Sequence, residues 1–306
     1  MPTLDAALLA RLSLAVSEVR EGHRLLAAEA MEGGISATMV RLEVETPSGD
    51  RTRWVGRLPG DWSVAHDPNG SQRMATLLGA LRTSGIPCPE PIGVETHDRP
   101  FLFMEYLEGA PRVQTSDWPA FGRAVAERLA AIHTTRLPDT IALRGASAGR
   151  KRPESGNPSL REDEVWDALQ DLVPGRETLV HGDFWPGNLI WRDDELVGVV
   201  DWEEAHVGDP LCDVGISRLD MLWVGGWVAV EAFTQRYFEC VQTESDLSQY
   251  DLRAALRPME NLAEWASAYP KLGRPDITEA YMAERLLAFI ENALQYGRNE
   301  RRSKVN

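Results

Sequence analysis

Apolar residues change their spacing along the chain, and the change predicts a β-rich first part. Leucines and valines at helical spacing predict one amphipathic helix over residues 4–30. A second helix is expected over residues 71–83, before a rigid connector rich in glycine and proline. The expected strands contain alternating or β-branched apolar residues and lie at 37–46, 52–58, 92–96 and 101–106.

The rest of the chain has a mostly helical pattern. Residues 117–134 have the periodicity of a helix, and three or four further helices are expected towards the C-terminus, with a break near Gly225 and Gly226. The pattern therefore predicts an α+β fold with two lobes. A small β-rich N-lobe would comprise residues 1–108, and a larger helical C-lobe residues 109–306.

The composition is that of a globular chain with an acidic surface. Hydrophobic residues make up 43% of the chain and charged residues 26%, and the net charge is −15. This charge repels phosphate backbones, so nucleic acid is not expected as a partner. It would attract a cationic small molecule or serve solubility alone, and composition does not decide between these two uses.

The cysteines and the hydropathy of the chain indicate which cellular compartment to expect. The three cysteines are scattered without a CxxC pair, which argues against a disulfide framework and against a zinc site. No apolar stretch approaches the roughly 18 residues of a membrane span, and the first residues lack the features of a signal peptide. We therefore expect a cytoplasmic protein that has no membrane partner.

Two short apolar runs separated by a polar turn predict a β-hairpin between residues 189 and 200. If this hairpin is centred on Asp194 and Glu195, then Asn188 and Asp201 face each other at its open end. Directly opposed residues have β-carbons about 4.5–5.5 Å apart. An amide oxygen and a carboxylate at that separation can share a magnesium ion, which takes its other ligands from water and substrate phosphates.

Asp183 lies five residues before Asn188, in the loop that leads into the hairpin. A carboxylate there can accept the proton of an attacking hydroxyl and hold it in line with a γ-phosphate. His181 is expected to brace this loop by hydrogen bonding, and Gly182 and Gly187 to supply unusual backbone torsions. The spacing is that of a kinase catalytic loop, H-x-D-x-x-x-x-N, with a metal-binding aspartate downstream.

The segments LVHGDFWPGNLIW and LVGVVDWEEAHVGDPLCDVG resemble the core of the aminoglycoside phosphotransferase and choline kinase group, the phosphotransferase enzyme family. The resemblance implies a kinase-like fold and ATP- and Mg²⁺-dependent transfer of phosphate to a small-molecule hydroxyl. The acceptor would be an antibiotic such as an aminoglycoside or macrolide, or an amino alcohol or sugar metabolite. GTP stays open as an alternative donor, and the oligomeric state is not indicated.

The same resemblance implies roles for individual residues of the larger lobe. Asp183 would be the catalytic base, and Asn188 and Asp201 the metal ligands. Asp213 would hydrogen-bond the catalytic loop and hold its shape. A helix N-cap is an equally good interpretation of Asp213.

The resemblance also implies a nucleotide site in the smaller lobe. Gly34 and Ser36 fall in the family's phosphate-covering turn, and Arg57 in its third strand. The backbone of Glu105 and of Leu107 would bind the adenine edge.

The phosphate-anchoring end departs from the kinase pattern. Arg57 stands where kinases usually carry a lysine, and no glutamate occurs in the helix expected over residues 71–83. Asp61 or Asp67 could pair with Arg57 instead. The departure keeps a second hypothesis open, that of a pseudokinase or nucleotide-binding scaffold without catalysis.

Four glutamates are candidates for acceptor binding. Glu203 and Glu204 follow the metal-binding aspartate, and Glu260 and Glu264 would share one helix face at i and i+4. Carboxylates facing the pocket would suit a cationic acceptor. The alternative for each is a solvated surface position.

Overall fold

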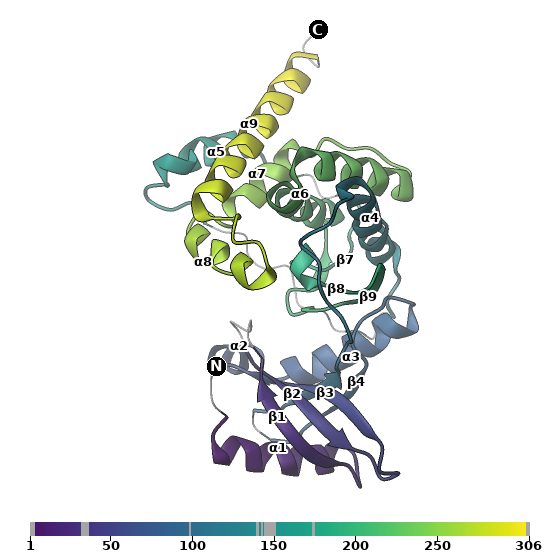
Figure 1. The fold of residues 1–306 in the computed structure, drawn as a ribbon. Coiled ribbons are helices and arrows are strands. Elements are labelled where there is room, and N and C mark those ends of the chain that lie inside the picture. Colours follow the sequence, from purple (N-terminus) through teal and green to yellow (C-terminus); the bar gives the residue numbers. More distant parts are fainter. Residues whose placement is uncertain are drawn as a thin grey trace. The chain divides into compact units, whose positions relative to one another are not determined.

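The computed structural model describes residues 4–31, 37–97, 99–138, 141, 143, 151–172 and 175–303, with side chains described as far as residue 296. The chain divides into two compact units (Figure 1). The first consists of Met1–Gly109, Leu137–Leu143 and Glu195–Val200; the second consists of Ala110–Arg136, Arg144–Asp194 and Asp201–Asn306. The described residues combine a β-sheet unit with a mainly helical unit, as the sequence pattern predicts.

The first unit begins with helix α1, Ala6–Val19, which is shorter than expected. Asp5 caps it by accepting a hydrogen bond from Leu8 N at 2.7 Å. The helix ends before Gly22, whose φ of +77° breaks the helical path. The single helix predicted over residues 4–30 is therefore wrong in its second half, which forms strand β1, Arg24–Ala30. Pairing with β2 overrides the helix propensity of its Leu, Ala and Glu residues.

Five antiparallel strands form the sheet of the first unit, in the order β1–β2–β3–β5–β4. The predicted strands are confirmed as β2 Ala37–Glu45, β3 Arg51–Pro59, β4 Pro91–Val94 and β5 Leu102–Glu105. The predicted second helix is confirmed as α3, Gly70–Thr83, and a short α2, Asp61–His66, was not expected. Leu12 and Val16 of α1 pack on buried Leu42 and Phe103 of the sheet, so α1 covers one sheet face.

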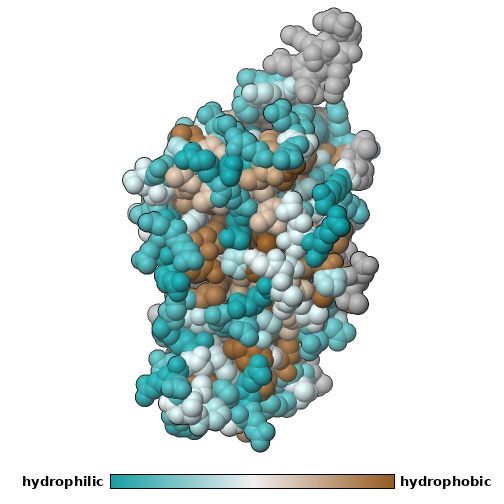
Figure 2. Space-filling model, turned by 90° about the vertical axis from the view of Figure 1, so that its right-hand side faces the viewer, coloured by the Kyte–Doolittle hydropathy of each residue, from teal (hydrophilic) through white to brown (hydrophobic). Residues whose placement is uncertain are grey.

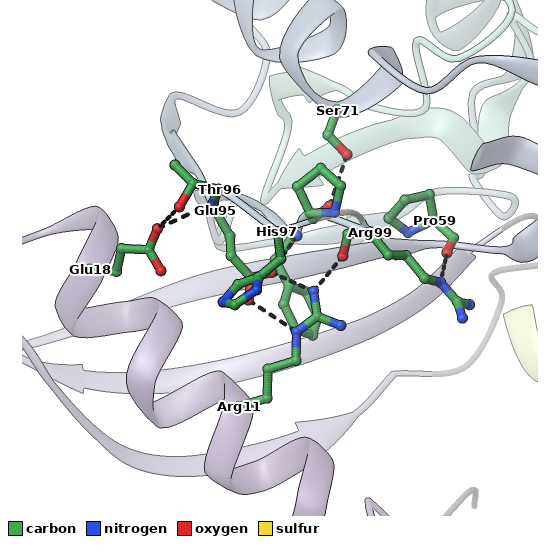
Figure 3. A network of polar contacts seen from close by, with 10 residues as sticks. Arg11, Glu18, Pro59, Ser71, Glu95, Thr96, His97 and Arg99 are labelled. Carbon is green, nitrogen blue, oxygen red and sulfur yellow. Dashed lines mark hydrogen bonds and ion pairs between the residues drawn. The ribbon is translucent and has the colours of Figure 1, made fainter. Parts of the chain in front are cut away.

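A buried carboxylate ties α1 to the connection between β4 and β5 (Figure 3). Arg11 donates to Glu95 Oε1 at 3.0 Å and to Oε2 at 2.6 Å, and Phe101 N donates to Oε2 at 2.9 Å. Glu95 is only 3% exposed, and these donors offset the cost of burying its polar side chain.

The second unit is built around α4, Trp118–Thr134, packed against α6, Pro210–Val241 (Figure 1). Asp117 caps α4 through Ala120 N at 2.9 Å, and Gly226, with φ +71°, interrupts α6 where the sequence predicts a break. The remaining helical segments of this unit are η1 Pro158–Leu160, α5 Glu162–Ala168, η2 Pro186–Asn188, α7 Ser248–Leu256, α8 Leu262–Ala266, η3 Tyr269–Leu272 and α9 Glu279–Ser303.

Short strands hold the segment that carries the kinase-like motif. Strand β7, Thr178–Val180, pairs with β10, His206–Gly208, and β8, Leu189–Arg192, lies between β6, Ala110–Pro111, and β9, Glu195–Val199. The turn between β8 and β9 consists of Asp193 and Asp194. The predicted centre at Asp194 and Glu195 is wrong by one residue, because Asp193 takes the left-handed conformation, with φ 54°, that a tight turn needs.

The surface is mostly polar on the side drawn in Figure 2. Hydrophilic residues cover much of this face, with apolar areas between them. None of the helices in the described part of the chain has the length and apolarity that a membrane crossing needs.

Candidate active site

The motif loop runs from β7 to β8, and the carboxylate of Asp213 holds its start. Asp213 lies in the first turn of α6 and is fully buried. Its Oδ2 accepts a hydrogen bond from His181 N at 2.6 Å, and its Oδ1 accepts one from Gly182 N at 2.8 Å. One side chain therefore occupies two consecutive backbone donors of the loop and fixes its path.

A second layer supports this carboxylate. His133 of α4 places Nε2 3.1 Å from Asp213 Oδ2 and Nδ1 2.7 Å from the Tyr237 hydroxyl. Burial raises the pKa of Asp213, but the hydrogen bond and charge of His133, aided by His181, lower it more, so the pKa lies below its usual value. Asp213 is thus ionised at neutral pH inside the protein.

The N-cap of α6 is Asp209, not Asp213. Its side chain accepts from Leu211 N at 3.0 Å and from the Tyr250 hydroxyl at 2.7 Å. The capping alternative for Asp213 is therefore wrong, since Asp213 lies inside the helix and contacts the motif loop.

His181 has no exposed surface and serves the loop from inside. Its Nδ1 accepts a hydrogen bond from Asp183 N at 3.2 Å, and its ring packs against Phe184 and Trp202, with centroid distances of 5.7 and 4.6 Å. A ring this enclosed can orient Asp183 and is not accessible to a substrate.

The two glycines of the motif are needed for different reasons. Gly182 has φ +84°, and a β-carbon there would lie 2.6 Å from the carbonyl oxygen of Glu204. Gly187 has no positive φ; instead a β-carbon would collide with the ring of Trp185 at 2.1 Å. The expectation of an unusual torsion therefore holds for Gly182 only, and Gly187 is required by close approach.

Asp183 is held between two donors that come from different elements. Asn188 Nδ2 donates to Asp183 Oδ2 at 3.1 Å and to the Asp183 carbonyl at 2.9 Å. On the other oxygen, Arg257 Nη2 donates to Oδ1 at 2.9 Å. Asp183 remains about one-third exposed, so the carboxylate is oriented and still accessible.

Asn188 and Asp201 each carry a side-chain oxygen of the kind that magnesium prefers. Because Asn188 turns its amide nitrogen towards Asp183, its amide oxygen is the atom left to ligate a cation. Asp201 is exposed and has a left-handed backbone, with φ 61°, which is uncommon outside glycine and concentrated at functional sites. Hard oxygen donors in small number fit magnesium. In the described residues, no group of three or more His, Cys, Asp or Glu could hold a metal by itself.

The predicted nucleotide residues belong to the first unit. Gly34 and Ser36 lie outside the described residues. Arg57 lies on β3, opposite Leu102 of β5. Glu105 N donates to Glu90 O at 2.9 Å, so this N–H is already used.

Leu107 follows strand β5 and keeps a backbone donor. Its N–H makes no hydrogen bond within the part of the chain that is described. This donor is therefore available for the edge of a nucleotide base. Asp61 forms an ion pair with Arg99 at 2.8 Å, and Asp67 forms one with Arg73. Both acids considered as partners of Arg57 thus have other arginines beside them.

The four candidate glutamates are not gathered on one helix face. Glu260 lies in a turn, because Pro258 cannot continue α7 and α8 begins only at Leu262. The predicted shared face of Glu260 and Glu264 is therefore wrong, and both residues are exposed. Glu203 is half-buried, and Glu204 is exposed and adjoins the loop through its backbone against Gly182.

Three residues near Asp183 and Asp213 were not found from the sequence as parts of the site. Arg257 reaches Asp183 from the end of α7, 74 residues away. Asp220 of α6 is 5% exposed and interacts electrostatically with both Arg257 and Asp183. His133 is a buried histidine of α4, and one of its partners is Asp213. No local spacing marks these residues, because tertiary packing alone brings them to the loop.

The chain is similar in sequence to known proteins. The profile described as the phosphotransferase enzyme family matches residues 27–250. The homoserine kinase of Rhodospirillum rubrum is 29% identical over 219 residues, which cover 65% of this chain and 63% of that protein. A probable acyl-CoA dehydrogenase of Arabidopsis thaliana is 30% identical over 165 residues, which cover 42% of this chain and 19% of that protein.

Comparison with solved structures shows that the chain shares its fold with known enzymes. The macrolide 2'-phosphotransferase of Brachybacterium faecium aligns with a TM-score of 0.57 at 20% identity, over 89% of this chain and 97% of that one. This likeness confirms the expected kinase-like α+β fold. The chain spans about a fifth of the length of the curated relatives that it matches first.

Proposed function

The chain belongs to the phosphotransferase enzyme family, and on this premise we propose that it transfers the γ-phosphoryl group of ATP, with Mg²⁺, to a hydroxyl of a small molecule. The proposal rests on the orientation and accessibility of the Asp183 carboxylate. Its carboxylate is oriented by Asn188 and Arg257, and its loop is fixed by the buried Asp213. An oriented, accessible carboxylate in this motif is what a base for hydroxyl activation requires.

The proposed chemistry assigns one proton and one bond exchange to this site. Asp183 accepts the proton of the acceptor hydroxyl while that oxygen forms a bond to the γ-phosphorus. The bond from the γ-phosphorus to the bridging oxygen breaks, and ADP leaves. Asn188 and Asp201 would hold magnesium, which when bound neutralises phosphate charge.

The first unit is proposed to bind the nucleotide. Arg57 would meet the phosphates, together with the turn containing Gly34 and Ser36. The Leu107 N–H and the Glu105 carbonyl would bind the base edge. GTP is a second candidate donor, and competition between the two nucleotides for turnover would decide between them.

The acceptor class is open between two groups of compounds. The relatives include a homoserine kinase and a macrolide phosphotransferase, so a metabolite and an antibiotic are both candidates. The proposed location is the cytoplasm, where ATP and such acceptors meet.

A coupled assay of ADP formation tests the proposal. It would screen amino alcohols, hydroxy acids, sugars, aminoglycosides and macrolides with the wild-type chain and with Asp183→Asn and Asp201→Asn. Acceptor-dependent turnover that both substitutions abolish is expected. Nucleotide binding without turnover on every class would instead support the pseudokinase hypothesis.

A further inference from the structure

A guanidinium that belongs to no part of the kinase motif lies beside the proposed base. Arg257 directly follows α7, and its Nη2 donates to Asp183 Oδ1 at 2.9 Å and to Gly182 O at 3.4 Å. Its side chain is about one-third exposed. The guanidinium carbon lies 5.7 Å from the ring centroid of Trp265, within the range of a cation–π contact. The guanidinium of Arg257 is thus bonded to Asp183 along one edge, and one of its faces lies over the ring of Trp265.

The other edge of this guanidinium has donors to offer. Arginine carries five N–H donors in a planar fork that matches a carboxylate. Within the described residues, the side-chain hydrogen bonds of Arg257 all come from Nη2, and its Nε and Nη1 have no partner. A half-buried arginine with spare donors is a receptor for an anion.

Arg257 also lies where an acceptor has to bind. Asp183 turns Oδ2 to Asn188, on the side of the proposed metal ligands, and Oδ1 to Arg257. A hydroxyl that gives its proton to Asp183 therefore brings its neighbouring substituents close to Arg257. A positive substituent would be repelled there, and a negative one attracted.

A second carboxyl, that of Asp220, lies near Arg257 besides Asp183. Asp220 is buried close to Arg257 and Asp183, and burial raises the pKa of its carboxyl well above the usual value, although Arg257 lowers it in part. Burial therefore favours the uncharged form of this carboxyl, and it makes no hydrogen bond to any described residue. Trp265 adds apolar surface beside Arg257, and its ring packs edge-on against the buried Trp223 with centroids 6.0 Å apart.

We propose that Arg257 is a specificity residue that selects acceptors bearing a carboxylate near the hydroxyl to be phosphorylated, so that the substrate class is a hydroxy acid. The proposal rests on the proposed phosphotransferase function. The proposed acceptor is anionic, whereas the acidic composition of the chain was compatible with a cationic acceptor. The carboxylate would take the fork of Arg257 while the hydroxyl takes Asp183.

Matched acceptors test this assignment with the wild-type chain of 306 residues. Each set contains an ω-hydroxy carboxylate, its primary amide and the corresponding amino alcohol, over several chain lengths. A charge-assisted bidentate pair of about 2–3 kcal/mol predicts a kcat/KM for the best carboxylate about 30- to 150-fold above that of its amide. Equal or better turnover of amides or amino alcohols would overturn the assignment and leave the proposed function intact. Turnover of no acceptor at all would contradict both.

Variants separate recognition from a merely structural role. Arg257→Gln removes a donor to Asp183, so it should lower kcat for both acceptors. In addition it should reduce the preference for carboxylate over amide to about threefold or less by raising KM for the carboxylate, whereas Arg257→Lys should keep about a tenfold preference. Arg253→Gln, one turn earlier on α7 and bonded to Gln249 O and Gln170 O, is the matched control and should keep the full preference. A preference that survives Arg257→Gln, or an equal loss of kcat/KM on carboxylate and amide, would overturn the assignment.

Discussion

The carboxylate of Asp213 accepts a hydrogen bond from the backbone N–H of His181 at 2.6 Å, across 32 residues of sequence. A buried anion that is bonded to a loop backbone acts on both stability and geometry. Asp213→Asn removes the charge and replaces an accepting oxygen by a donor. We expect unfolding in urea to show a loss of about 3–5 kcal/mol, the usual cost of breaking a buried charged pair.

Turnover of Asp213→Asn should fall about 10- to 100-fold, because the loop that orients Asp183 shifts. The pH dependence has a definite sign. The folded-state pKa of Asp213 is lowered, so the stability it contributes is present above its ordinary pKa and lost as pH falls through the folded value. Wild type should therefore lose more stability than Asp213→Asn on acidification; equal losses would contradict the role given to this carboxylate.

Gly182→Ala tests whether the loop backbone is as constrained as the structure indicates. A β-carbon at Gly182 meets both a φ of +84° and the Glu204 carbonyl at 2.6 Å. Gly49, with φ +87° and nothing within 4 Å of a β-carbon, is the matched control. Gly49→Ala should cost about 1–2 kcal/mol in thermal or urea unfolding, and Gly182→Ala at least about 2 kcal/mol more. Similar costs at the two positions would show that the loop can yield.

Glu95→Gln tests the buried link in the first unit (Figure 3). The substitution leaves Arg11, which is 30% exposed at its side chain, without its anion. We expect a loss of about 2–3 kcal/mol in urea unfolding, below the value for a fully buried pair. Glu45→Gln breaks the exposed pair with Arg24 and should cost at most about 1 kcal/mol. A cost for Glu95→Gln no larger than for Glu45→Gln would rule out a stabilising role for this link.

Asp220→Asn should change the pH dependence of stability in the opposite sense to Asp213→Asn. Burial raises the folded-state pKa of Asp220 well above its ordinary value. As pH rises above the ordinary value, the unfolded chain releases this proton and the folded chain keeps it, so wild-type stability falls. The variant lacks this loss, and its stability relative to wild type should increase from about pH 4 to pH 7. The urea unfolding midpoints of both proteins at about pH 4 and pH 7 would measure the change. If the stabilities of wild type and variant changed equally with pH, a raised pKa of Asp220 would be contradicted.

Local chemistry explains which parts could be predicted. The strand alternation around Val40 and Leu42, the cap at Asp117 and the break at Gly226 are all visible in short stretches of sequence. The end of α1 was missed because Leu, Ala and Glu residues that favour a helix are drawn into β1 by pairing with β2.

Some residues of the candidate site could likewise be predicted from a local motif, and others could not. Asp183 and Asn188 lie in one motif that the sequence reveals, and in the structure a hydrogen bond joins their side chains. Arg257 and His133 reach the loop through the packing of α7 and α4, and no motif records such distant contacts. Specificity is harder to predict than the shared chemistry for this reason.

Transfer of phosphate from γ-labelled ATP to a hydroxy acid, followed in wild type and in Asp183→Asn, is the most direct test of the central claim. Removal of a general base predicts that the rate of labelled phosphate ester formation falls about 10²- to 10⁴-fold, with nucleotide binding retained. A wild-type chain that binds the nucleotide and forms no ester with any acceptor would contradict the account, as would an Asp183→Asn variant that forms the ester at the wild-type rate.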